Sequence, residues 1–248
     1  MLKDIYIILR NFLFDLLFPC CCLGCGAEGS WICQQCLKTI DIIKQPFCSE
    51  CRRSTSYGEF CDRCKKDFAL DGIFICANFN EGVLKEAIHQ YKYSFVFDIG
   101  EILGKIINGK LNYELGIMNH ELKFDMVVPV PLHKKRKAWR GFNQSEVLGK
   151  VIAKKSNIKI EKKILVRNKY TTPQMELDRD RRLENLKDVF EINNVGIDSY
   201  QSLRTIQNKN ILLVDDITTT GATLEECAKV LKINGAKSVW AIVLAKGK

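Results

Sequence analysis

Four C-x2-C cysteine pairs constrain the N-terminal quarter of this 248-residue chain more than any other feature. A C-x2-C turn presents two thiolates to one tetrahedral metal ion, and two such turns complete a four-sulfur zinc site. We expect two sites in chain order, with an interleaved pairing (first pair with third) as the open alternative. The expected ligands are Cys22, Cys25, Cys33 and Cys36, then Cys48, Cys51, Cys61 and Cys64.

These sites are predicted to be structural, because four sulfur ligands leave no open metal position for a substrate. About 45 residues so poor in other apolar side chains do not fold without metal. We therefore expect a zinc-ribbon module over residues 19–68. Either Cys20 or Cys21 could replace Cys22 as a ligand. The alternative of redox-active thiols does not account for the regular spacing.

An amphipathic helix is expected over residues 1–18, where apolar residues recur at helical spacing. Charged residues interrupt the segment, so its longest uncharged run is too short to cross a bilayer, and no signal-peptide cleavage site follows. Its polar face is acidic, which favours packing on the protein's own body over a membrane anchor. We expect a cytosolic protein without a transmembrane segment, with peripheral membrane contact left open.

Residues 69–248 are predicted to form an α/β domain, because strand-like and helix-like stretches alternate. A mostly parallel sheet flanked by helices follows, with ligands at the carboxyl ends of its strands. Cys76 and Cys227 fall within these elements and are expected to be buried. The expected strands are 72–79, 124–130, 160–166, 210–214 and 238–244, and the expected helices are 82–93, 97–107, 143–155 and 220–234.

The segment 211–223 predicts a binding site for a ribose 5-phosphate. Four apolar residues form a buried strand, Asp215 and Asp216 stand at its end, and a Thr/Gly-rich turn enters a helix. The turn amides and the helix N-terminus suit a phosphate, while two carboxylates can accept hydrogen bonds from a vicinal diol. No Gly-Lys-Ser/Thr follows, which excludes a nucleotide-hydrolysing P-loop. The phosphate-binding residues are expected to be Thr218, Thr219, Thr220, Gly221, Ala222 and Thr223.

A strongly basic segment follows the second expected strand. Five of the nine residues 132–140 are Lys or Arg, and Trp139 and Phe142 place aromatic rings among them. We expect a basic loop after this strand, either a solvated basic surface or a single-stranded nucleic-acid footprint on the residues alone; the diphosphate-binding role comes only from the resemblance described below. The net charge of +9 fits any anionic partner. Residues 167–182 are expected to form a mobile loop over the site, with Gln174, Arg179 and Arg182 reaching inward.

Two resemblances refine this picture. Residues 211–223 resemble the diphosphoribosyl-binding motif of type I phosphoribosyltransferases. The run Asp125-Met-Val-Val-Pro-Val-Pro-Leu-His133, the run Arg140-Gly-Phe-Asn-Gln144 and the block that begins at Thr172-Pro-Gln resemble the ComF family of competence proteins. That family also carries an N-terminal cysteine-knuckle module, a double zinc ribbon. The resemblance covers the chain from about residue 18 onward and implies a type I phosphoribosyltransferase-like fold.

The resemblance also implies a function. It suggests binding of phosphoribosyl diphosphate (PRPP) with Mg²⁺ and transfer of the ribosyl 5-phosphate group to an unidentified acceptor. The implied catalytic residues are Asp215, Asp216 and Arg140, and the diphosphate would be held by Pro131, Leu132, His133 and Arg140. Lys92 and Tyr93 resemble an element of the family's hood.

The family implies a role in natural transformation and DNA uptake, with a helicase partner, on the cytosolic side of the inner membrane. A non-catalytic protein that binds single-stranded DNA or senses PRPP is the alternative.

Overall fold

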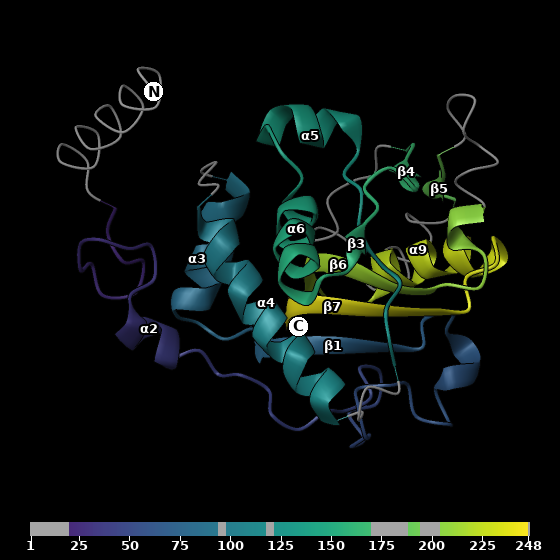
Figure 1. Cartoon of the computed structure of the whole chain (residues 1–248). Coiled ribbons are helices and arrows are strands. Elements are labelled where there is room, and N and C mark those ends of the chain that lie inside the picture. The colour runs from purple at the N-terminus through teal and green to yellow at the C-terminus, as the bar shows by residue number, and fades with distance from the viewer. Residues whose placement is uncertain (1–19, 94–97, 118–121, 170–187, 194–203, 248) are drawn as a thin grey trace.

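The computed structural model describes residues 20–93, 98–117, 122–169, 188–193 and 204–247 (Figure 1). The helix expected over residues 1–18 and the expected inward-reaching residues Gln174, Arg179 and Arg182 lie outside the described residues. Among the helices that are described, none combines the length and the hydropathy needed to cross a membrane.

A five-stranded parallel sheet forms the centre of the described part. Each strand is parallel to its neighbours, which confirms the predicted mostly parallel α/β arrangement. The central strands are buried on both faces, and this is why they read as continuous apolar runs in the sequence. In spatial order the strands are β1 (Gly72–Asn78), β7 (Ser238–Lys246), β6 (Asn210–Thr218), β2 (Met126–Pro129) and β3 (Lys159–Ile160).

Helices cover both faces of the sheet (Figure 1). One face packs on α3 (Val83–Tyr93), α4 (Ile99–Ile117) and α6 (Gln144–Ser156) through side chains such as Leu212 and Val214. The other face packs on α9 (Ala222–Ile233) through Ile211 and Leu213. Cys76 and Cys227 are buried in β1 and α9, as the sequence predicted.

Two predicted elements differ from the observed ones at charged residues. The strand expected over 160–166 is two strands, β3 and β4 (Leu165–Arg167), separated by Glu161, Lys162 and Lys163. Those charges cannot enter a buried strand, so the chain leaves the main sheet, and β4 pairs antiparallel with β5 (Phe190–Ile192). The basic segment expected to be a loop is instead the helix α5 (Lys134–Arg140), ended by Gly141 in the left-handed conformation at φ 72°.

Two other elements are longer than predicted. Strand β6 does not end at Val214 but continues to Thr218, because β7 offers hydrogen-bonding partners as far as Lys246. Asp215 and Asp216 therefore lie within the strand rather than after it. Helix α4 runs to Ile117 because buried Leu111 keeps the apolar spacing beyond residue 107.

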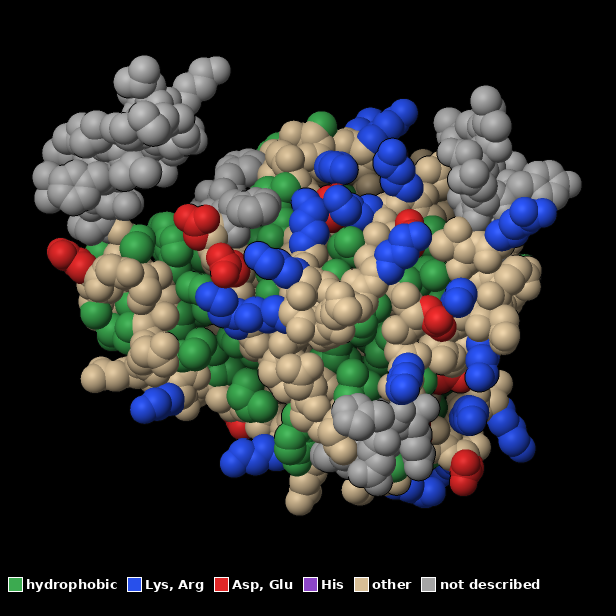
Figure 2. All heavy atoms as spheres, viewed as in Figure 1, with side chains coloured by type: hydrophobic (Ala, Val, Ile, Leu, Met, Phe, Trp, Pro, Cys, Tyr) green, Lys and Arg blue, Asp and Glu red, His purple; other side chains and the backbone are tan. Residues whose placement is uncertain are grey.

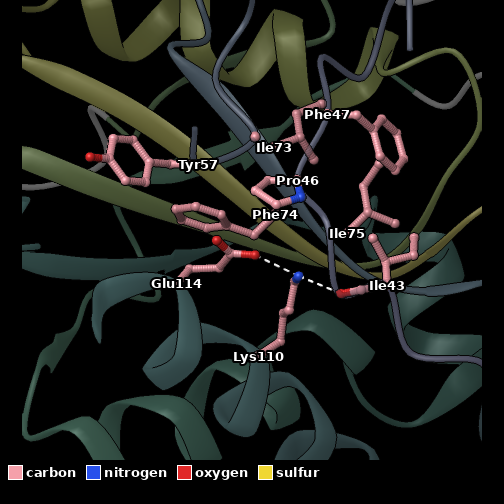
Figure 3. Close-up of a pocket in the computed structure, with 10 residues that line it drawn as sticks. Ile43, Pro46, Phe47, Tyr57, Ile73, Phe74, Ile75, Lys110 and Glu114 are labelled. Carbon is pink, nitrogen blue, oxygen red and sulfur yellow. Dashed lines mark hydrogen bonds and ion pairs between the residues drawn. The ribbon is translucent and has the colours of Figure 1, made fainter. Parts of the chain in front are cut away.

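A buried ion pair on α4 lies next to the cysteine-rich segment, and its lysine donates a hydrogen bond to that segment (Figure 3). Lys110 and Glu114 are one turn apart on α4, with Nζ and Oε1 2.5 Å apart and side chains only 3% and 1% exposed. The Lys110 ammonium also donates a hydrogen bond of 2.6 Å to the backbone carbonyl of Ile43, which connects the two cysteine tetrads. This part of the cysteine-rich segment is thus bonded to α4.

Candidate functional site

Two groups of four cysteines come together in the structure, in chain order. All four Sγ atoms of each group lie within 4.8 Å of one another, with 3.7 Å between Cys25 and Cys33 and 3.6 Å between Cys51 and Cys61. Ligands about 2.3 Å from a tetrahedral zinc ion are about 3.8 Å apart, so both groups match this geometry. The chain-order pairing is confirmed over the interleaved one. Cys22 belongs to the first group, whereas Cys20 and Cys21 belong to neither.

Backbone amides stabilise the thiolates of the first tetrad. The Cys33 amide donates to Cys22 Sγ at 3.3 Å, and the Cys36 amide donates to Cys33 Sγ at 3.4 Å. The first of these hydrogen bonds lowers the pKa of Cys22 to about 6, against the effect of burial. A metal site needs thiolates, and these amide hydrogen bonds favour the thiolate form of Cys22 and Cys33 by lowering the pKa of each thiol.

Asp215 and Asp216 lie near the carboxyl end of β6 and have different partners. Asp215 Oδ1 accepts hydrogen bonds from Ser145 Oγ at 2.7 Å and from the Asp216 backbone amide at 2.9 Å. Asp216, which is 6% exposed, forms an ion pair of 3.0 Å with Lys92 from the end of α3. Helices α3 and α6 therefore each supply one partner to the acid pair.

The charge of Asp216 affects the protonation of Asp215. Burial, and then the neighbouring charge of Asp216, raise the pKa of Asp215 to about 7. A carboxyl group in this state changes charge near neutral pH. When ionised, the pair can accept hydrogen bonds from a diol, which fits a site where positive charge develops.

The turn after β6 exposes unpaired backbone donors. Gly221 has a φ of 83° and caps α9 without a side-chain hydrogen bond. Within the described residues, the N–H groups of Thr219, Thr220 and Gly221 donate to no protein acceptor, and the Ala222 N–H has only a long contact of 3.4 Å to Thr220 Oγ1. We call residues 218–223 the phosphate turn, because three free amides at a helix N-terminus suit an anion.

A basic hollow of about 380 Å³ lies beside the end of β2. Pro131, Leu132 and His133 line it, together with the cationic side chains of Lys134, Lys137, Lys162, Lys163 and Arg167 and the carboxylate of Glu146. Figure 2 shows Lys and Arg side chains gathered around α5 on this face. Burial, and then the nearby Lys134, lower the pKa of His133, whose Nδ1 accepts the Lys135 amide at 3.2 Å. None of the residues of the phosphate turn lines this hollow.

Arg140 takes a place different from the other expected diphosphate residues. Its guanidinium carbon lies 5.5 Å from the ring centroid of Tyr93, and the Trp139 ring is 6.0 Å from the same ring. Trp139 is 58% exposed. The Nε atom of Arg140 is buried without an acceptor among the described residues. Arg140 therefore lies at the junction of α3 and α5, while Pro131–His133 line the basic hollow.

Ser145 is a site residue that the sequence alone did not indicate. It stands in the first turn of α6, where the Asn143 side chain accepts the Ser145 amide at 3.2 Å and fixes the helix start. Its contact with Asp215 depends on β2 and β6 being neighbours, which the chain order does not reveal. The sequence indicated Lys92 only through its resemblance to the family's hood element. In the structure it forms an ion pair with Asp216.

Family comparisons agree with this architecture. Residues 143–248 match the phosphoribosyl transferase domain, and residues 13–65 match the double zinc ribbon domain. "Competence protein F" of Haemophilus influenzae is 29% identical over 219 residues, covering 86% of this chain and 90% of that protein. "DNA utilization protein YhgH" of Escherichia coli strain K12 is 28% identical over 216 residues, with coverages of 86% and 89%.

"Competence protein ComFC" of Bacillus subtilis is 23% identical over 231 residues, covering 87% of this chain and 84% of that protein. The chain is thus similar over most of its length to competence and DNA utilization proteins, the group that the ComF resemblance indicated. It thus combines a double zinc ribbon with a type I phosphoribosyltransferase-like domain, as the sequence resemblance implied. A glutamine PRPP amidotransferase structure from B. subtilis aligns with 58% of this chain and 25% of its own, at 18% identity and a TM-score of 0.35.

Proposed function

We propose that this protein binds PRPP with Mg²⁺ in its α/β domain and transfers the ribosyl 5-phosphate group to an acceptor. The observation that carries the proposal is the set of three unpaired amides at 219–221, directly after the paired carboxylates of Asp215 and Asp216. The phosphate turn directly follows Asp215 and Asp216 in the chain. A phosphate bound in the turn therefore leaves both carboxylates within reach of the ribose hydroxyls.

Each part of the site has a role in this proposal. The phosphate turn binds the 5-phosphate, and the two carboxylates accept hydrogen bonds from the ribose hydroxyls. Ser145 and Lys92 orient the carboxylates through their 2.7 Å and 3.0 Å contacts. The basic hollow at Pro131–His133 binds the diphosphate, whereas Arg140 lies outside this hollow, against Tyr93. Mg²⁺ bound with the substrate would neutralise part of the diphosphate charge.

The proposed reaction breaks the bond between the anomeric carbon and the diphosphate oxygen. The electron pair leaves with the diphosphate, and the acceptor's nucleophilic atom forms the new bond to the anomeric carbon. Positive charge develops on the sugar, and Asp215 and Asp216 stabilise it electrostatically. Catalysis in such a site rests on positioning and charge.

Calorimetric titration with PRPP and Mg²⁺ tests this function. We expect binding at pH 8 and weaker binding at pH 6, because Asp215, with its pKa raised to about 7, is protonated below that value and then accepts hydrogen bonds poorly. The Asp215→Asn variant should show a smaller pH dependence than the wild type. Absence of PRPP binding at pH 8 would exclude the proposed substrate.

We propose a cytoplasmic role in DNA uptake. The names of two similar proteins, "Competence protein F" and "DNA utilization protein YhgH", support this assignment. Incoming DNA in natural transformation is single-stranded, and a helicase partner at the inner membrane is the proposed neighbour.

Single-stranded DNA binding by α5 is a second candidate function. An exposed Trp139 on a helix with Lys134, Lys135 and Lys137 combines a stacking surface with cations. Replacing these three lysines by Ala should reduce the slope of log affinity against log salt by about 2, since each phosphate contact on a single strand contributes about 0.7. The triple variant of Lys105, Lys154 and Lys155, which are exposed elsewhere, should keep the slope. An unchanged slope in the α5 variant would exclude this function.

We further propose two structural zinc ions, one per tetrad. The matched Sγ geometry and the double zinc ribbon family support this. Metal analysis of the purified protein should find two zinc ions per chain, and the Cys21→Ser variant should retain both because Cys21 lies outside the tetrads. One zinc ion per chain would mean that one tetrad does not bind metal.

A further inference from the structure

The two cysteine tetrads pack against opposite faces of the sheet. Cys48, Phe60 and Cys64 of the second tetrad's segment belong to the same buried cluster as Ala222 and Leu224 of α9. Leu23, Cys36 and Leu37 of the first segment pack instead in the cluster that contains α3 and α4. The second tetrad therefore shares its hydrophobic core with the helix that begins at the phosphate turn.

Glu225 bonds this helix to the chain that follows the second tetrad. It stands in the first turn of α9 and is 6% exposed. Its carboxylate accepts the amides of Ala69 at 2.7 Å and Leu70 at 3.2 Å, within six residues of Cys64. Its own amide donates to Gly221 in the turn at 2.9 Å. Glu225 thus fixes the helical end of the phosphate turn to the second tetrad's segment.

Lys246 makes the corresponding bond at the other end of the turn. Its ammonium donates to the backbone carbonyl of Ser49, a buried residue between Cys48 and Cys51. Lys246 is the register partner of Thr218, where the phosphate turn begins, and the next amide, of Gly247, donates to the Thr218 carbonyl at 2.7 Å. The strand end of the turn is therefore also attached to the second tetrad.

We propose that Glu225 and Lys246 are positioning residues that couple metal binding at the second tetrad to anion binding in the phosphate turn. A folded second tetrad holds both ends of the turn at the spacing in which the 219–221 amides converge. The first tetrad, on the opposite face, has no part in this coupling. The ligand of the turn is the one assigned under the proposed function, so this inference rests on it.

Coupling of this kind is reciprocal, since a metal that strengthens phosphate binding is itself bound more tightly when phosphate is present. Typical couplings change affinity by roughly 5- to 150-fold. PRPP should therefore slow metal loss from the second tetrad and leave the first tetrad unaffected.

The test follows alkylation of each cysteine in the zinc-loaded full chain after addition of a chelator, by peptide mass spectrometry. With saturating PRPP and Mg²⁺, we expect Cys51 and Cys61 to be alkylated at least about 5-fold more slowly, and Cys25 and Cys33 at an unchanged rate. The Glu225→Ala and Lys246→Met variants, with two zinc ions retained, should lose this protection. The Glu226→Gln variant should keep it, because Glu226 points to Lys229 rather than to the zinc ribbon. Equal protection of both tetrads, or full protection in both positioning variants, would overturn the coupling.

A second readout separates this inference from the proposed function. Amide hydrogen exchange at Ala69, Leu70 and Glu225 should rise when zinc is removed from the wild-type protein in the absence of any ligand. The Ala69 and Leu70 amides then lose the Glu225 carboxylate as their acceptor, and the Glu225 amide loses its fixed position against the Gly221 carbonyl. Unchanged exchange would refute the coupling. Faster exchange without any PRPP binding would support the link and refute the substrate.

Discussion

Replacing Asp215 and Asp216 together by Asn should weaken PRPP binding by about 10²- to 10⁴-fold. Each carboxylate would accept a hydrogen bond from a ribose hydroxyl, and a hydrogen bond to a charged group contributes about 1.5–3 kcal/mol. A factor of ten in affinity corresponds to about 1.4 kcal/mol, so two such bonds give the stated range. Calorimetric titration at pH 8 with Mg²⁺ measures the loss.

The double variant should remain folded. A carboxyl group whose folded-state pKa is raised opposes folding when it ionises, and Asp215 has its pKa raised to about 7. At pH 8 the Asn side chain at 215 therefore removes an unfavourable charge, and this gain in stability shrinks as the pH falls from about 7 and disappears below the ordinary aspartate pKa of 3.8. The loss of the Asp216–Lys92 ion pair acts in the opposite direction. We expect a melting temperature at pH 8 close to that of the wild type.

Glu226→Gln is the matched control for this experiment. Glu226 is an acid on α9, close in sequence to the phosphate turn, and its carboxylate pairs with Lys229 at 2.7 Å. The PRPP affinity of the Glu226→Gln variant should equal that of the wild type. Equal affinity in the double Asn variant as well would show that the acid pair does not contact the ligand, and the proposed site would be wrong.

Local patterns in the sequence predicted most of the α/β domain. The run Ile211–Val214 is buried on both faces of a parallel sheet, and such strands are recognisable because both faces require apolar residues. The local C-x2-C spacing predicted the cysteine ligands but left two pairings open, and the structure has the chain-order one, in which each tetrad spans fewer than about 20 residues. Both features depend on neighbours in the chain.

Features that depend on neighbours in space were not predictable. The extension of β6 to Thr218 requires β7 beside it, and the contact of Ser145 with Asp215 requires β2 beside β6. The prediction of a loop at helix α5 was wrong because a run of basic residues shows no periodic apolar pattern that would indicate a helix. It begins where His133 Nδ1 accepts the Lys135 amide, and it ends at Gly141. These tertiary and capping contacts decide the structure where the pattern is weak.

The Lys110→Met substitution should destabilise the folded protein by about 3–5 kcal/mol, the usual cost of removing one partner of a buried ion pair. Lys110 is the only cation paired with the 1%-exposed Glu114 among the described ion pairs, and it also donates to Ile43. Its loss leaves a buried carboxylate and a backbone carbonyl without donors. For a chain of this size the melting temperature should fall by roughly 6 to 20 °C.

This loss should grow with pH. Burial already raises the pKa of Glu114, with Lys110 acting in the opposite direction, so the variant raises that pKa further. Below the ordinary pKa of a glutamate the carboxyl is protonated in both states and adds no penalty, and the penalty increases as the pH rises above that value. Thermal unfolding of the variant at pH 5 and pH 8 measures the difference.

Helix α4 provides its own control for the Lys110 substitution. Lys105 and Glu101 have the same spacing of four residues, but their side chains are 56% and 69% exposed. The Lys105→Met substitution should therefore cost less than about 0.5 kcal/mol. The double substitution Lys110→Met with Glu114→Leu should recover most of the lost stability, because no unpaired charge remains buried. A Lys110→Met variant as stable as Lys105→Met would mean that this ion pair does not hold the cysteine-rich segment to α4.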